Sequence, residues 1–299
     1  LHPNPKASPD YNRNLETFLC TILPILSGFF NYRPYYYYTQ SGHEDRSYEL
    51  YPFFFITEKQ VLLLSSDMTT FIFTENPEVI RAYTQEFQRI LKNSRCFFQQ
   101  SDSPDQILDI FSSIFQAEAT TNFALESHPC LALMSYGPEF IHALFENRDI
   151  DLSSPVYSQL AAVLKQPQFT FTANEVSCNY FTVSGIRKFA ETGLFDGPYS
   201  YHQTPLPQDI RKKAIQHLLD TDMGYGKCKI LKHTLLPETG IHLEVLSDYS
   251  VFLCFLSEKG TFICIYLKET SIGQALDDYL CSLSEEDAIY TKKEARQIL

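Results

Sequence analysis

Few residues of this 299-residue chain stand in a pattern that catalysis or metal binding uses. The eight histidines are dispersed, and none belongs to an HExxH, an HxH or a Cys/His pair with metal-ligand spacing. His128 and Cys130 flank a proline, but a nucleophile and its base must meet in space and not merely in sequence. The glycines of 223–227 lack the GxxxxGK(S/T) spacing of a phosphate loop. We therefore predict no catalytic residue, no metal site and no cofactor.

Two short groups of residues are candidates for ligand binding. Four consecutive tyrosines read as a strand with two rings on each face, so that Tyr36 and Tyr38 share a face and can present hydroxyls to a ligand. Ser65, Ser66 and Asp67 would lie beyond the carboxyl end of a strand, where ligands collect in doubly wound sheets. The simpler alternatives are an aromatic edge strand for the tyrosines and a plain turn for the triplet.

A third candidate lies in the loop 195–207, which is rich in proline and glycine. It contains Tyr199, Tyr201 and His202, an aromatic and polar set within one segment. Long ordered loops often carry functional residues, so we predict that this loop acts as a lid over a ligand.

Composition and charge describe a folded, acidic chain. It is 44% hydrophobic and 14% aromatic, and 24 basic against 36 acidic residues give a net charge of −12 with no evident basic stripe. Polyanions are therefore poor partners for this chain by itself. There is no CxxC motif, no signal peptide and no membrane-spanning run, and several cysteines lie within apolar strands or helical patterns, where a thiol acts as a small hydrophobe. We expect a reducing, cytoplasmic location.

The segment 53–91 predicts two strands, a third short strand and a helix. Phe53–Ile56 and Val61–Leu64 are continuous apolar runs around a polar turn, which indicates a hairpin buried on both faces. A strand over 70–74 follows, and Asn76 caps the helix. Its predicted buried stripe consists of Val79, Ile80, Tyr83, Phe87, Ile90 and Leu91.

The segment 251–283 repeats this order of elements. Its turn FLSEKG matches FITEKQ at 55–60, again between apolar strands and ahead of a helix. Two such units, about 50–92 and 241–284, favour a pseudo-twofold arrangement in which both hairpins join a central sheet. The alternative is that apolar hairpins with this kind of turn are simply common. With a lead-in over 1–13, we predict a single large α/β domain over 14–299, a mixed sheet covered by helices.

Further helices are predicted from periodicity and capping residues. They cover about 14–30 with a kink at Pro24, 183–191 ended by Gly193, 208–219, and a last helix that begins with a capping box at Thr291 and Glu294. Strands over 227–236 and 241–246 lead into the second hairpin.

The hairpin units are similar in rhythm to the phospholipase D repeat, in which His-x-Lys precedes an Asp and a Gly-Ser-x-Asn strand end. With Thr57 at the Asp position, Leu64-Ser65-Ser66-Asp67 falls on the Gly-Ser-x-Asn element. Leu50 and Pro52 then take the His and Lys positions, and the second unit has Ser250 and Phe252 there. The nucleophile and the phosphate-binding lysine are absent from both, so the resemblance does not extend to catalysis.

Over about 15–299 the chain also resembles the C-terminal sensory region of helix-turn-helix regulators from Gram-positive bacteria. The segments that carry this resemblance are YPFFFITEKQVLLLSSD, SGIRKFAETG with PLPQDIRKKAIQHLL, and YLKETSIGQALDDYLCSL. It implies an effector-sensing or protein-interaction domain that is not an enzyme. The implied partners are a small-molecule or peptide effector and a second copy in a homodimer. DNA would be bound only by a separate N-terminal domain before Leu1. The alternative is a hydrolase or phosphodiesterase-like enzyme with an unrecognised site.

Overall fold

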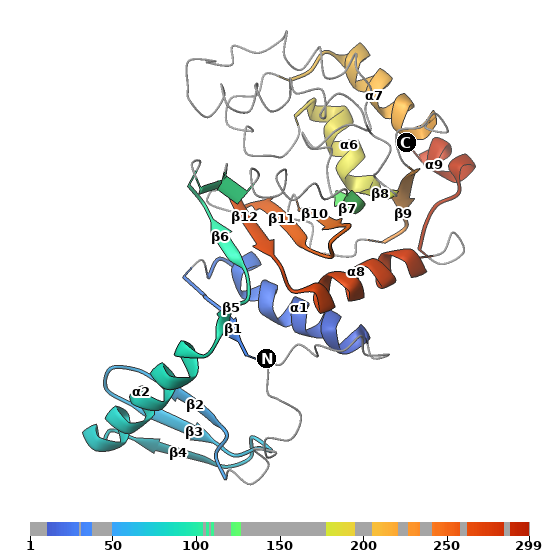
Figure 1. Cartoon of the computed structure of the whole chain (residues 1–299). Coiled ribbons are helices and arrows are strands. Elements are labelled where there is room, and N and C mark those ends of the chain that lie inside the picture. The colour runs from blue at the N-terminus through green and yellow to red at the C-terminus, as the bar shows by residue number, and fades with distance from the viewer. Residues whose placement is uncertain are drawn as a thin grey trace. The chain divides into compact units, whose positions relative to one another are not determined.

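The chain has an α/β fold, as the sequence predicts (Figure 1). The computed structural model describes residues 11–29, 31–37, 50–103, 106–107, 109–110, 121–126, 178–194, 205–220, 227–233, 241–257, 262–283 and 288–298. Contacts divide the chain into two compact units, where the sequence analysis expected one domain over 14–299. Unit 1 comprises Leu1–Pro5 and Arg33–Phe97, and unit 2 comprises Lys6–Tyr32 and Phe98–Leu299.

Unit 1 contains two small antiparallel sheets and one described helix. Strand β1 (Tyr35–Tyr36) pairs with β5 (Arg95–Cys96). The second sheet has the order β2-β3-β4, with β2 (Phe53–Ile56), β3 (Val61–Leu64) and β4 (Phe71–Thr74). Helix α2 (Pro77–Lys92) follows β4.

Helix α2 begins where its sequence predicts. Asn76 accepts a hydrogen bond from the Glu78 N–H at 2.9 Å, and Pro77 occupies the first turn, where its missing N–H costs nothing. Arg89 and Lys92 lie in the last turn, where positive charge is favourable for the helix dipole. The helix packs on one face of the three-stranded sheet, with the rings of Phe54 and Tyr83 5.3 Å apart.

Unit 2 is built on a seven-stranded mixed sheet. Its strands, in spatial order, are β6 (Gln99–Ser101), β12 (Phe262–Leu267), β11 (Val251–Leu256), β10 (His242–Leu246), β7 (Thr121–Glu126), β8 (Cys178–Thr182) and β9 (Lys227–Leu231). The pairs β7–β8 and β8–β9 are parallel, and the others are antiparallel. The sheet is covered by helices, as the mixed pattern of strands and helices predicts.

Five described helices surround this sheet: α1 (Tyr11–Leu26), α6 (Val183–Thr192), α7 (Gln208–Asp220), α8 (Thr270–Ser282) and α9 (Lys292–Ile298). Figure 1 shows α1 and α8 on one side of the sheet and α6 and α7 on the other. The Tyr180 hydroxyl donates to the Leu280 carbonyl at 2.8 Å, which ties β8 to α8. On the opposite side, Phe181 belongs to a buried cluster with Phe189, Leu218 and Ala295 of the three other helices.

Several local predictions are confirmed by hydrogen bonds. Gly193 ends α6 in the left-handed region, with φ 69°. The capping box of α9 forms, because the Thr291 N–H donates to the Glu294 carboxylate at 2.8 Å and the Glu294 N–H donates to the Thr291 hydroxyl at 3.3 Å. The Thr291 hydroxyl also donates to this carboxylate at 2.8 Å, and the hydrogen bonds from the hydroxyl and the N–H of Thr291 hold the pKa of the Glu294 carboxyl below its ordinary value.

Three predictions about the first hairpin are wrong. The two hairpins do not join one central sheet, because β2–β3 pair with β4 while β11–β12 lie in the seven-stranded sheet. The β2–β3 hairpin is not buried on both faces, and no residue of α2 is buried. The reason is geometric: among the described residues, one helix packs on this three-stranded sheet, and it covers one of the two faces.

Candidate functional site

The predicted tyrosine site is only partly described. Tyr36 is buried in β1, and its ring meets Phe97 edge to face at 5.7 Å and 88°. This is a packing contact, as expected of an aromatic strand. Tyr38 lies outside the described residues, as do Tyr199, Tyr201 and His202 of the predicted lid and the pair His128 and Cys130. Binding by these residues stays a prediction.

The Ser65–Asp67 triplet forms the turn between β3 and β4. The Ser65 hydroxyl donates to the Asp67 carboxylate at 2.6 Å and accepts from the Thr70 N–H at 3.0 Å. Thr69 donates to the same carboxylate through its N–H at 3.1 Å and its hydroxyl at 2.8 Å. The sheet is antiparallel, so the rule for ligands at the carboxyl ends of doubly wound sheets does not apply. Ser65 and Asp67 hold the turn, and Ser66 is exposed beside them.

The Asp67 carboxylate gives a prediction for pH dependence. Hydrogen bonds from Ser65 and Thr69 lower its pKa from 3.8 to about 2. A carboxyl whose pKa is lowered on folding stabilises the native state above its unfolded pKa, and this contribution is lost as pH falls through the folded value. We expect Asp67→Asn to lower the melting temperature by a constant amount above about pH 4.5, and the difference to shrink between about pH 4 and about pH 2. Thermal melts at each pH would show it; a difference at about pH 2 as large as the difference at neutral pH would contradict this role.

The described residue set that the sequence analysis missed is an exposed apolar face of the β2-β3-β4 sheet. Residues paired in register share a face, and two rows, Phe53–Leu64–Phe71 and Phe55–Leu62–Phe73, lie on the same one. We call these six residues the phenylalanine face.

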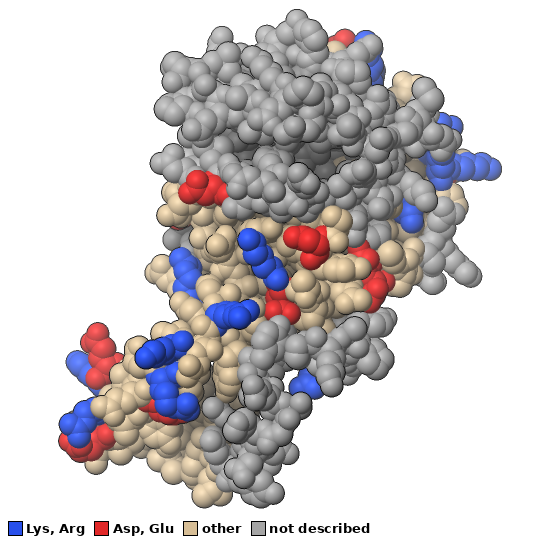
Figure 2. Space-filling model, in the orientation of Figure 1, with Lys and Arg blue, Asp and Glu red and all other residues tan. Residues whose placement is uncertain are grey.

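The phenylalanine face is open to solvent. Its four phenylalanines are exposed by 43%, 61%, 65% and 53% for Phe53, Phe55, Phe71 and Phe73, respectively. Helix α2 packs on the other face, through Phe54. Basic and acidic side chains lie together over α2 (Figure 2). The six residues of the phenylalanine face include no charged residue. With a phenylalanine side chain worth about 200 Å², the four rings expose about 450 Å². Apolar patches of that size on a soluble protein are often functional.

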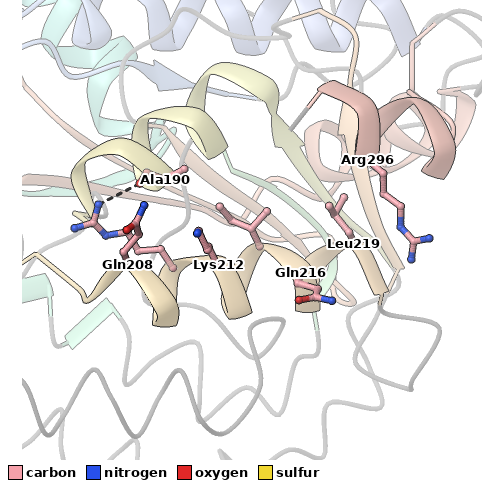
Figure 3. Close-up of a pocket in the computed structure, with 8 residues that line it drawn as sticks. Ala190, Gln208, Lys212, Gln216, Leu219 and Arg296 are labelled. Atoms are coloured by element: carbon pink, nitrogen blue, oxygen red, sulfur yellow. Dashed lines mark hydrogen bonds between the residues drawn. The ribbon is translucent and has the colours of Figure 1, made fainter.

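A second candidate lies in unit 2, where α6, α7 and α9 border a hollow of about 610 Å³. Its described lining residues comprise three cations, two amides and three apolar side chains (Figure 3): Arg211, Lys212, Arg296, Gln208, Gln216, Ala190, Ile215 and Leu219. None of them carries a carboxylate.

Arg211 is fixed at one end of this hollow by carbonyls from the end of α6 and from the residue Leu206 before α7. Its guanidinium donates to the carbonyls of Leu206 at 2.6 Å, Ala190 at 3.1 Å and Glu191 at 2.9 Å. A Cβ on Gly193 would lie 2.4 Å from Arg211 Nε, so only glycine allows this approach. These three acceptors are neutral carbonyls, which orient the guanidinium without cancelling its charge.

A buried polar pair lies where β10 begins. His242 Nε2 is 2.6 Å from Glu244 Oε1, and the two side chains are 5% and 16% exposed. Cys254, which is 7% exposed, is the residue directly opposite His242 on β11. An imidazole held by a carboxylate beside a thiol is the set of groups that a cysteine nucleophile uses. Burial of His242 and partial burial of Glu244 are also what a structural hydrogen-bonded pair shows.

No family model, curated protein or solved structure matches this chain. Within the described ranges, no three His, Cys, Asp or Glu residues are grouped so that they could hold a metal ion. Among the described helices, none is long and apolar enough to cross a membrane. The site must therefore be judged on its own geometry.

The phenylalanine face and the cations of the hollow differ in how strongly the sequence pattern indicates them. The apolar runs of β2, β3 and β4 were recognised, and strict register would have placed four phenylalanines on one face. What the runs could not show is that the four phenylalanine side chains of this face are exposed. The cations of the hollow come from α7 and α9, which are far apart in sequence, so no local pattern joins Arg296 to Arg211 and Lys212.

Proposed function

We propose that this chain is a non-catalytic protein-interaction module that pairs with a second copy of itself through the phenylalanine face. The observation that carries the proposal is the exposed, uncharged face formed by two rows of apolar side chains across β2, β3 and β4. Face-to-face packing of two such sheets, about 10 Å apart, is an ordinary way to build a core between sheets.

The area of the face fits a weak dimer. If each copy covers about 450 Å² of phenylalanine surface, two copies bury about 900 Å², and the flanking leucines and rim bring the total to about 1,000–1,200 Å². That is the lower end of the range for specific interfaces. Because association must also offset lost rigid-body freedom, we expect a dissociation constant in the micromolar range.

Charge favours pairing at this face over pairing elsewhere. Each copy carries a net charge of −12, so two copies repel each other at most surfaces. An uncharged face brings no like charges into direct contact. It also predicts that salt strengthens association, because screening weakens the long-range repulsion while apolar contacts are unaffected or strengthened.

Sedimentation velocity tests the proposal directly. Over about 1–100 μM protein we expect a reversible monomer–dimer equilibrium, and raising NaCl from about 50 to about 500 mM should shift it toward dimer. A chain that stays monomeric throughout this range, or a dimer that salt dissociates, would contradict pairing through an uncharged face.

We also propose that the chain is the sensory part of a transcriptional regulator. The resemblance to sensory regions of helix-turn-helix regulators supports an effector-sensing role, with DNA bound by a separate domain. Effector binding would then shift an existing equilibrium between two states of the dimer. A cytoplasmic location is also proposed, supported by the free thiols of Cys20, Cys264 and Cys281.

One observation favours the alternative, a hydrolase: the set of His242, Glu244 and Cys254. A screen of p-nitrophenyl esters would separate the two functions. Turnover that is lost in Cys254→Ser and kept in Cys264→Ser would establish the enzyme, since Cys264 is the buried neighbour of Cys254 on β12. Absence of turnover in the wild-type chain would support the interaction module.

A further inference from the structure

The packed helices α6, α7 and α9 carry a local positive charge in an acidic protein. Together they contain eight lysines and arginines against four acidic residues, a formal charge of +4, whereas the whole chain is −12. The sequence analysis expected no basic stripe, because these helices are separated in the sequence. Contacts of α7 with both other helices bring the cations together, and Figure 2 shows basic side chains over α7 and α9.

Three of these cations, Arg211, Lys212 and Arg296, line a hollow of the size that small ligands need. Its volume of about 610 Å³ lies within the usual range of about 300–1,000 Å³ for ligand sites. Figure 3 shows Lys212 between Gln208 and Gln216 along α7, and Arg296 of α9 beside Leu219. Amides and cations thus alternate along one side of α7, next to the apolar side chains of Ile215 and Leu219.

The described lining of the hollow contains no acidic side chain from these helices. Glu191, Asp209 and Glu294 are not among the described lining residues, and Glu294 accepts the hydrogen bonds of the α9 capping box. Lys212 is exposed on α7. An anion that entered the hollow would therefore meet positive charge and hydrogen-bond donors without a facing carboxylate from these residues.

The helices that border the hollow are packed on a buried apolar cluster. Ala214, Leu218 and Ala295 on its helices are buried in one apolar cluster with Phe181 and Phe189. Arg211 is held by two carbonyls at the end of α6 and by the Leu206 carbonyl before α7. A site on packed helices with an oriented guanidinium loses little order on binding, which favours affinity.

We propose that this hollow binds a small organic anion, a carboxylate or phosphate group attached to an apolar body. The anionic group would lie near Lys212 and the oriented guanidinium of Arg211, and the apolar body would lie against Ile215 and Leu219. This names a ligand class for the effector of the proposed sensor, but it does not depend on pairing of two copies.

Calorimetric titration of the whole chain tests this site with four probes: octanoate, octyl phosphate, octylamine and inorganic phosphate. We expect saturable binding of octanoate or octyl phosphate, and the comparison of these two tells carboxylate from phosphate recognition. Octylamine should not bind, because its charge is reversed. Inorganic phosphate should bind far more weakly, because it lacks an apolar body. Equal binding of octylamine, equal binding of phosphate, or no binding of either amphipathic anion would overturn the proposal.

Two matched variants locate the binding. Lys212→Gln removes one lining charge, and we expect about tenfold weaker binding of the anion. Lys293→Gln makes the same change on α9, at an exposed position that does not line the hollow, and should alter binding less than about twofold. Equal weakening by both variants would show a non-specific effect of net charge and overturn the assignment. Thermal melts of both variants confirm that each remains folded.

Discussion

Replacement of Gly273 by alanine is expected to destabilise unit 2 by at least about 3 kcal/mol. Gly273 lies in α8, and a Cβ there would be 1.8 Å from the carbonyl oxygen of Tyr249 and 2.6 Å from its carbonyl carbon. Both atoms belong to the backbone, so no side-chain rotation can relieve the overlap. Either α8 or the β10–β11 turn must move.

Neither element can move easily. The turn is closed by hydrogen bonds between Leu246 and Ser250 at 2.9 Å and between Tyr249 and Leu246 at 2.9 Å, and Tyr249 already has φ 59°. Asn14 of α1 donates to the Ser271 carbonyl at 3.3 Å, which holds α8 from its other side. Displacement of α8 would also uncover Ile272 and Leu276, which are buried.

Chemical denaturation of the wild-type chain and two variants measures this effect. Gln274→Ala is the matched control, because the neighbouring residue is only partly buried and should change stability by less than about 0.5 kcal/mol. A Gly273→Ala variant as stable as the control would mean that α8 and the turn do not approach this closely.

The sequence predicts features that are decided within a few residues. The N-cap at Asn76, the glycine stop at Gly193 and the capping box at Thr291 all form, because each depends on local hydrogen bonds or on one φ angle. The two apolar hairpins form for the same reason. Short apolar runs around a polar turn pair with each other whatever covers them.

The sequence could not predict which apolar strands would be buried beneath other elements. Phe55 in β2 and Phe255 in β11 occupy the same place in matching turns, yet Phe55 is 61% exposed and Phe255 is 2% exposed. The β11 strand lies inside a seven-stranded sheet between layers of helices, whereas β2 is an edge of a three-stranded sheet with one helix. Such differences arise from tertiary packing, which an apolar run does not encode.

The candidate sites also differ in whether local sequence or tertiary packing forms them. Asp67 stood out in the sequence because it is polar and follows a strand, and the structure shows it holding a turn. Lys212 did not stand out, since the hollow that it lines forms only where α6 and α9 pack beside α7. Sites assembled from distant elements need the fold before they can be recognised.

The double substitution Phe55→Ser with Phe73→Ser is expected to weaken pairing of two copies by more than about 100-fold. These residues flank Leu62 in one row of the phenylalanine face, and a symmetric dimer loses both rings from each copy. Buried aromatic side chains near the centre of an interface contribute about 2 kcal/mol or more each, so loss of four rings should leave a monomer at micromolar concentrations. The fold should persist, because both side chains are more than half exposed.

Phe29→Ser is the matched control for this variant. Phe29 is 67% exposed in unit 2, outside the phenylalanine face, so its replacement removes an exposed ring without touching the face. Sedimentation at equal protein and salt concentrations should show a monomer for the double variant and an unchanged equilibrium for the control. If the double variant still pairs as the wild type does, copies meet through another surface; if both variants weaken pairing equally, association reflects general apolar exposure. Only selective loss in the double variant identifies the phenylalanine face as the interface, because both variants lose exposed aromatic surface but only one changes this sheet.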